Sequence, residues 1–262
     1  VLGTIVAFFM SLSSLFRKDS FVSLPYLLRE KVRPRMESLK GLAKLGSSVL
    51  LEQLLMRVGF MTTALMAAKL GTDAFAAHNV GMNLLSLSFS FGDGIGIAGT
   101  ALVGQSLGEK RPDIAHMYGK IAQRYALVAA LLLASVVITC RGPLVGLYIY
   151  SDTANDAYVR QLAMNAMIVV GIMQPFQTSA VVYSGALRGA GDTRYVALAM
   201  ILTVVVMRPL LSSLAIYVVG EVWGRTEMAL IGAWCMATLD MITRMALMHR
   251  RYVGGKWHAI QL

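Results

Sequence analysis

A glutamate inside an apolar segment is the first residue of this sequence whose position suggests chemistry. Glu52 stands in "LLEQLLMRVGF". At helical spacing, the same face also carries Met56, Gly59 and Thr63. Arg57 falls on another side of such a helix and does not neutralise Glu52 as a helix neighbour. A carboxyl group in apolar surroundings can take up and release a proton. Glu52 is therefore predicted either to couple a proton or cation, or to pair with a basic residue of another helix.

Other charged residues also lie inside apolar segments. Asp93 stands in the glycine-rich stretch "FGDGIGIAG" and is predicted either to cap a helix break or to bind a cation. Arg208 precedes Pro209 and is predicted to pair with one of the two carboxylates or to fix a kink at the proline. Asp240 and Arg244, four residues apart, are expected to pair with each other.

Methionines and polar side chains near these charges are predicted to line a substrate cleft. Methionine forms an adaptable wall for apolar ligands, and a few polar groups orient the ligand. The predicted cleft residues are Met56, Gly59, Thr63, Asn83, Gln174, Gln177, Tyr183 and Arg208. The two cysteines, Cys140 and Cys235, form neither a disulfide framework nor a zinc spacing. We expect no cofactor and no metal, only a proton or sodium as coupling ion.

The elements that must position these residues are membrane helices. The chain has 262 residues, of which 56% are hydrophobic and 15% charged, and it is too apolar for an ordinary soluble surface. Its apolar residues come in blocks of about 20, the length a helix needs to cross a bilayer. Six full spans are predicted at 46–68, 74–104, 120–140, 158–187, 195–219 and 228–248. Residues 1–16 are interpreted as the end of a truncated span, because no signal-peptide order is present.

The net charge of +10 is interpreted as a signal of orientation in the membrane. Of the 24 Lys and Arg residues, 18 fall on the side of the segment 17–45 and the C-terminus, and 4 fall on the opposite side. By the positive-inside rule, this bias places the C-terminus in the cytoplasm of a plasma-membrane protein. We expect the lipid bilayer as a partner and no nucleic acid. The predicted domains are a basic connector at 17–45, a six-helix lobe at 46–250 and a cytoplasmic tail at 251–262.

Two of the spans, 74–104 and 158–187, exceed the roughly 30 Å hydrocarbon core and are expected to bend. The predicted bends are at the glycine-rich stretch and at Pro175. "GIGIAG" matches a dinucleotide-binding pattern, but it lies inside a membrane span and has no preceding strand, so it is interpreted as a helix-packing face. "GALRGAGDTR" (185–194) is predicted to be a cytoplasmic hinge, with arginines at the membrane surface, glycines in a tight turn, and Asp192 and Thr193 as helix caps.

Several stretches together resemble the multidrug and toxic compound extrusion family, in its DNA-damage-inducible F-type branch. They are "GALRGAGDTR", "LGTDAFAAHNVGMNLLSLSF", "LVGQSLG" and "GGKWH", within a likeness that runs through 41–258. The resemblance implies an all-α membrane protein with two six-helix lobes around a cleft, of which this chain is the second lobe with the end of helix six. The first lobe of the same polypeptide, or a second copy of the chain, would complete the transporter.

The resemblance also implies a cation-coupled antiporter that exports small amphipathic organic compounds by alternating access. Glu52 falls where relatives carry a coupling carboxylate, while Gln177 replaces a second one, which favours protons over sodium. A protonated Glu52 would suit a closed cleft, and a deprotonated Glu52 the substrate-loaded state. Two other functions stay open: a flippase for lipid-linked oligosaccharides, and an intramembrane metal enzyme using Glu52, His78 and Asp93, although no metal motif supports it.

Overall fold

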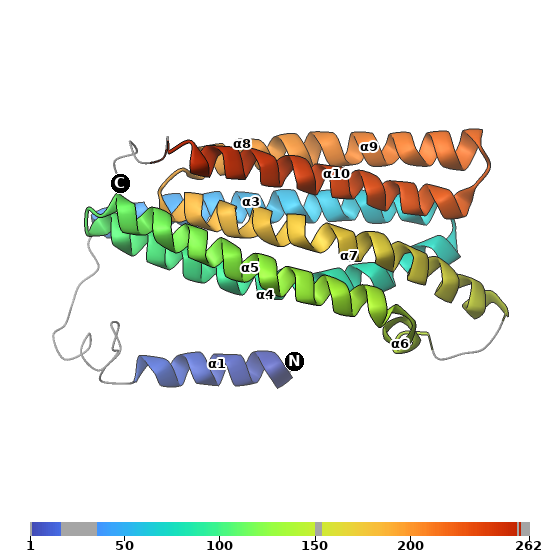
Figure 1. Ribbon diagram of the computed structural model, residues 1–262, viewed down its shortest axis with the longest axis horizontal. Helices are drawn as coiled ribbons and strands as arrows, with labels where there is room; N and C mark the ends of the chain where they lie inside the picture. The colour runs from blue at the N-terminus through green and yellow to red at the C-terminus, as the bar shows by residue number, and fades with distance from the viewer. Residues whose placement is uncertain (1, 17–35, 150–153, 256, 258–262) are drawn as a thin grey trace. The chain divides into compact units, whose positions relative to one another are not determined.

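The computed structural model describes residues 2–16, 36–149, 154–255 and 257 (Figure 1). The chain divides into two compact units, Val1–Ser47 and Ser48–Leu262. In the first unit, α1 (Leu2–Leu15) is an apolar helix, as predicted for residues 1–16, and its Phe8 and Phe9 side chains are exposed. Residues 17–35, most of the predicted connector, lie outside the described residues, and so does half of the predicted tail.

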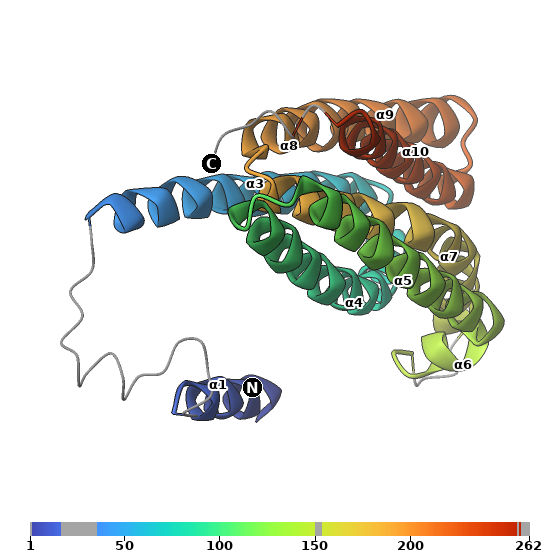
Figure 2. The same cartoon turned by 60° about the vertical axis from the view of Figure 1, so that its left-hand side comes forward.

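The described chain is helical in every long element. The remaining elements are α3 (Met36–Lys69), α4 (Thr72–Gly108), α5 (Pro112–Thr139), α6 (Arg141–Gly146), α7 (Ala154–Gly189), α8 (Thr193–Met200), the π-helix η1 (Ile201–Met207), α9 (Arg208–Ala215), the π-helix η2 (Ile216–Val222) and α10 (Thr226–Val253). The segment from α8 to η2 runs as one rod beside α10 in both views (Figures 1 and 2).

Six helical segments in the described part of the chain are long and apolar enough to cross a membrane. They are Val49–Lys69, Thr72–Gly108, Pro112–Thr139, Asp156–Gly189, Thr193–Val222 and Glu227–Val253. Each overlaps one predicted span, so the all-α, multi-pass prediction is confirmed. On α5, large apolar side chains such as Val128, Leu131 and Leu132 are exposed, as a lipid-facing surface requires.

The central helix is α7, which packs against α4, α5 and α10. Figure 1 shows it running between α5 and α10. Its span is 61% buried, whereas the span in α3 is only 11% buried. The second unit is therefore built around α7, and α3 is its most loosely held span.

The glycine-rich stretch of α4 forms a close seam with α7, as the packing interpretation predicted. The Thr100 hydroxyl donates a hydrogen bond to the Gly185 carbonyl at 2.8 Å. A Cβ added at Gly104 would lie 3.3 Å from the Gly189 carbonyl oxygen. Small residues let the two backbones approach at this distance, because no side chain separates them.

The predicted bends at the glycine-rich stretch and at Pro175 do not interrupt either helix, and the bends themselves stay predictions. Both α4 and α7 are continuous, and Pro175 lies inside α7. The irregular backbone is instead in the fifth span, where π-helices precede and follow α9. Pro209 has no N–H to donate to the preceding turn, which accounts for the widened turn directly before it.

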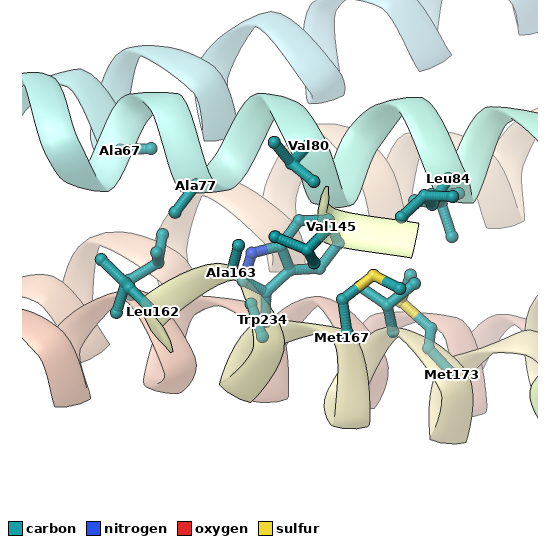
Figure 3. Close-up of a cluster of buried hydrophobic side chains, with 14 of the residues drawn as sticks. Ala67, Ala77, Val80, Leu84, Val145, Leu162, Ala163, Met167, Met173 and Trp234 are labelled. Atoms are coloured by element: carbon teal, nitrogen blue, oxygen red, sulfur yellow. The ribbon is translucent and has the colours of Figure 1, made fainter. Parts of the chain in front are cut away.

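An apolar core joins α4, α7 and α10 (Figure 3). Met167 and Met173 of α7 lie near Trp234 of α10, with Leu84 of α4 above them. His78 is buried beside Trp234, with ring centroids 5.2 Å apart, so it contributes to the packing of this core.

The turn after α7 differs in one respect from its prediction. Gly191 adopts a φ of 81°, which the predicted tight turn requires. Asp192 occupies the N-cap position of α8, but its side chain makes no capping bond. It accepts a hydrogen bond from Arg251 of α10 at 2.6 Å instead, so it ties two helices together.

Candidate functional site

A cavity of about 330 Å³ opens between α3, α4, α7, α8 and α10. Its lining combines charged, polar, methionine and aromatic side chains, a mixture suited to an amphipathic ligand. The lining residues are Glu52, Gln53, Met56, Arg57, Phe60, Met82, Ser86, Phe89, Asp93, Ala180, Val181, Ser184, Arg188, Met200 and Arg244.

Glu52 of α3 forms an ion pair with Arg188 at the end of α7. The two side chains are 13% and 17% exposed, so the pair is largely withdrawn from water. Glu52 was predicted either to couple a proton or cation or to pair with a basic residue of another helix. In the structure it has such a partner, Arg188 of α7. Arg188 was expected to meet water and lipid phosphate at the membrane surface; instead its side chain pairs with Glu52 and lines the cavity.

Asp93 of α4 lines the same cavity and is exposed to it. Among the described residues it has no hydrogen-bond or ion-pair partner, although the charges of Glu52 and Arg188 are near enough to interact with it electrostatically. It follows Gly92, which packs against Thr178 of α7. The structure thus places both predicted coupling carboxylates around one cavity, one of them paired and one open.

The expected partners of Arg208, Asp240 and Arg244 need correction. Arg208 pairs with Asp240, with a nitrogen–oxygen distance of 2.6 Å, and both side chains are almost fully buried. Arg208 therefore pairs with neither predicted carboxylate, and Asp240 does not pair with Arg244. The Arg208 guanidinium also lies over the Phe60 ring, 5.2 Å from its centroid. Helical spacing suggested a pair within α10, but packing brought Arg208 to Asp240 from α9.

Arg244 of α10 lies at the cavity with a different set of contacts. Its Nη1 approaches the sulfur of Met56 at 3.2 Å and that of Met200 at 3.1 Å. Its Nη2 donates to the sulfur of Met241. The residue is 4% exposed.

Most other predicted cleft residues lie outside this cavity. Met56 lines it, but Gly59 packs against Val204, and Thr63 donates to the Gly59 carbonyl. The remaining positions are Asn83, exposed elsewhere on α4; Gln174 and Gln177, buried within the bundle; Tyr183, hydrogen-bonded to His249; and Arg208, paired with Asp240.

Arg188, Arg244 and the aromatic residues Phe60 and Phe89 are lining residues that the sequence did not predict as such. Arg188 was assigned to a loop, whereas the structure includes it in the last turn of α7. Arg244 was assigned a neighbour on its own helix. A signal was present for both, since each lies within or beside an apolar span, where an ionisable side chain is a functional candidate.

Six helices long and apolar enough to span a membrane, five of which line a cavity with both positive and negative side chains, are typical of a multi-pass membrane transporter. The family model MatE matches residues 49–214, and the chain belongs to this family of multidrug and toxic compound extrusion (MATE) transporters, a class without enzymatic activity.

Curated relatives carry names of the same kind. A probable multidrug resistance protein NorM of Thermotoga maritima is 26% identical over 93% of this chain and 49% of the relative. A probable NorM of Mannheimia succiniciproducens is 33% identical over 62% of this chain and 34% of the relative. The multidrug resistance protein MdtK of Edwardsiella ictaluri is 31% identical over 60% of this chain. The chain thus spans between a third and a half of the length of these relatives, and they do not specify the F-type branch.

Solved structures share the fold. A crystal structure of MATE in complex with MaL6 superimposes with a TM-score of 0.80 at 17% identity, covering 96% of this chain and 54% of that one. An outward-facing multidrug resistance MATE family transporter gives a TM-score of 0.79 at 17% identity, with the same coverage of both chains. At this identity the likeness establishes the six-helix arrangement, and it accounts for about half of each matched chain.

Proposed function

We propose that the full-length protein containing this chain exports amphipathic organic compounds in exchange for a cation, with the proton as the favoured coupling ion. The names of its relatives as multidrug resistance proteins support export of such compounds. The mixed apolar and charged lining of the cavity supports an amphipathic ligand.

The observation that carries the proposal is the ion pair between Glu52 and Arg188. It joins α3, the most loosely held span, to α7, the central helix. An ion pair across a cavity between two helices makes their separation depend on the protonation of one carboxyl group.

Proton uptake by Glu52 would neutralise the carboxylate and remove its attraction to Arg188. The α3 helix then loses this connection to α7 and is free to shift, which changes access to the cavity. Release of the proton restores the pair. Because the two states differ in protonation, a proton gradient can drive the transition in one direction, as alternating access requires.

The test is Glu52→Gln in the full-length protein, reconstituted into lipid vesicles with separately imposed proton and sodium gradients. Glutamine keeps the size and polarity of the side chain but carries no titratable proton. Proton-driven export of a fluorescent amphipathic dye should fall at least tenfold. Glu221→Gln, an exposed carboxylate outside the cavity, should leave export unchanged.

Undiminished proton-driven export by Glu52→Gln would remove Glu52 from the mechanism. Export that responds only to a sodium gradient would replace the proton with sodium as the coupling ion. In that case Glu52 and Asp93, which face the same cavity, are the carboxylates to test as sodium ligands.

The proposal includes the setting of the transporter. We place it in the plasma membrane with its C-terminus in the cytoplasm. We also propose that the cleft is completed by a further six-helix lobe of the same polypeptide or by a second copy. The coverage of about half of each matched solved chain supports such a second part.

A flippase remains the second candidate because of the arginines at the cavity. Arg208 no longer counts toward a cationic cleft, since Asp240 neutralises it outside the cavity. Arg57, Arg188 and Arg244 do line it. A metal enzyme has less support: in the parts of the chain that the structure describes, three or more His, Cys, Asp or Glu side chains do not gather as a metal-binding group.

A further inference from the structure

Arg244 is a buried cation that lines the cavity and forms no ion pair with the described residues. It comes from α10, is 4% exposed and contributes to the cavity lining. Its nearest hydrogen-bond acceptors are the thioether sulfurs of Met56, Met200 and Met241, and its Nε has no partner. A thioether is a weak acceptor, so these contacts satisfy a guanidinium poorly.

The two carboxylates whose charges act on Arg244 are already paired with other arginines. Glu52 pairs with Arg188, and Asp240 pairs with Arg208. Within the described residues, Arg244 therefore has no ion-pair partner, although Asp240 and Glu52 are near enough to attract it. A guanidinium withdrawn from water and left unpaired is costly, and a ligand that brings an anionic group would offset that cost.

The groups beside Arg244 favour an apolar ligand body. Met56 and Met200, which contact the guanidinium, also line the cavity, and so do the aromatic rings of Phe60 and Phe89. Arginine presents several donors in a planar fork that matches a carboxylate or phosphate.

We propose that Arg244 binds the acidic group of an amphipathic ligand whose apolar part lies against the methionines and aromatic rings of the cavity. The inference rests on the proposed function, because it concerns the same cavity, and it specifies the ligand class: compounds with a carboxylate or comparable anion. Zwitterions belong to this class, since Asp93 lines the cavity without a partner in the described chain and can face a cationic group.

The probes are two dyes that differ in one ester. Rhodamine 19 carries an ionised benzoate beside its cationic ring system, and rhodamine 6G is its ethyl ester. Binding to the purified full-length protein in detergent is followed by fluorescence anisotropy. The acid should bind at least tenfold more tightly than the ester, as expected for a charge-assisted hydrogen bond to arginine. Equal binding of the two dyes by the unaltered protein would overturn the inference without any variant.

Two variants assign the preference to Arg244. Arg244→Met replaces the cation with an apolar side chain like its neighbours and should abolish the preference for the acid over the ester. Arg244→Lys keeps the charge and should retain part of the preference. The matched control is Arg250→Met, an exposed arginine of α10 outside the cavity, which should retain all of it.

A preference that survives in a folded Arg244→Met protein would place the anion site elsewhere and overturn the inference. If Arg244→Met does not fold, Arg244→Lys decides the question. An undiminished preference of this variant for the acid over the ester would exclude the bidentate arginine contact and overturn the inference. Transport separates this outcome from failure of the proposed function. Gradient-driven export of the ester with no preference for the acid contradicts only the role of Arg244, whereas export of neither dye contradicts the exporter.

Discussion

Three arginines of the helical unit have three different surroundings. Arg208 forms a buried pair with Asp240, Arg188 forms a partly exposed pair with Glu52, and Arg244 contacts sulfurs. The buried pair is outside the cavity, and it joins α9 to α10. The other two face the cavity, where a proton or a ligand can change their partners. We therefore expect the arginines at the cavity to act in transport and Arg208 to act in packing.

The pair between Glu52 and Arg188 should appear as coupling between two mutations. Glu52→Gln and Arg188→Gln each remove one charge, and together they should destabilise less than the sum of the single effects. The coupling in the free energy of unfolding should be about 0.5–3 kcal/mol, as for residues in direct contact. Denaturant unfolding in detergent micelles provides the measurement. Additive effects would mean that the two charges do not interact in solution.

At the scale of elements, the seam between α4 and α7 joins two helices of the second unit closely, while the span in α3 is the least buried of the six. Close backbone approach requires glycine on both helices, and Thr100 then donates across the seam. Because α7 is the most buried span and α3 the least, we expect a change in charge at Glu52 to move α3 more easily than the core. This difference in packing is what makes α3 the natural moving element of the proposed cycle.

A methyl group in the seam should separate the two helices. At Gly185, an added Cβ would lie 2.6 Å from the Gly96 carbonyl oxygen and 2.9 Å from the Thr100 hydroxyl. Gly185→Ala should lower the free energy of unfolding by about 1–3 kcal/mol, the usual cost of overpacking. Thermal unfolding in detergent measures it. Gly94→Ala is the matched control on α4, since nothing lies within 4 Å of its added Cβ, and it should be neutral or stabilising. Equal stability of the two variants would contradict the seam.

For the whole molecule, exposed apolar surface indicates that the chain lies in a membrane, whereas the distribution of charge indicates which way it is inserted. Exposed apolar side chains along α5 and the other spans indicate the lipid environment, because no water-soluble surface needs them. The excess of Lys and Arg on one side concerns the direction in which the spans are inserted. Membership of the MATE family agrees with the lipid environment, while the direction of insertion stays a prediction.

Labelling of a cysteine just after α5 tests the orientation of the chain in the membrane. Cys140 is exposed and free, and the charge bias predicts it on the outer side. In a Cys235→Ser background, a membrane-impermeant maleimide should label Cys140 in intact cells. Gly108→Cys in a cysteine-free background, at the other end of the bundle, should be labelled only after permeabilisation. The reverse pattern would invert the predicted topology.

The sequence alone determined the membrane helices and their order, because apolar length is a property of consecutive residues and needs no knowledge of neighbours. It also identified the glycine-rich stretch as a packing face and Glu52 and Asp93 as exceptional charges. Only the tertiary structure decided the partner of each charge, such as Arg188 for Glu52 and Arg208 for Asp240. Those pairs join residues 136 and 32 positions apart, and their formation depends on how helices rotate and pack, which helical spacing within one segment does not specify.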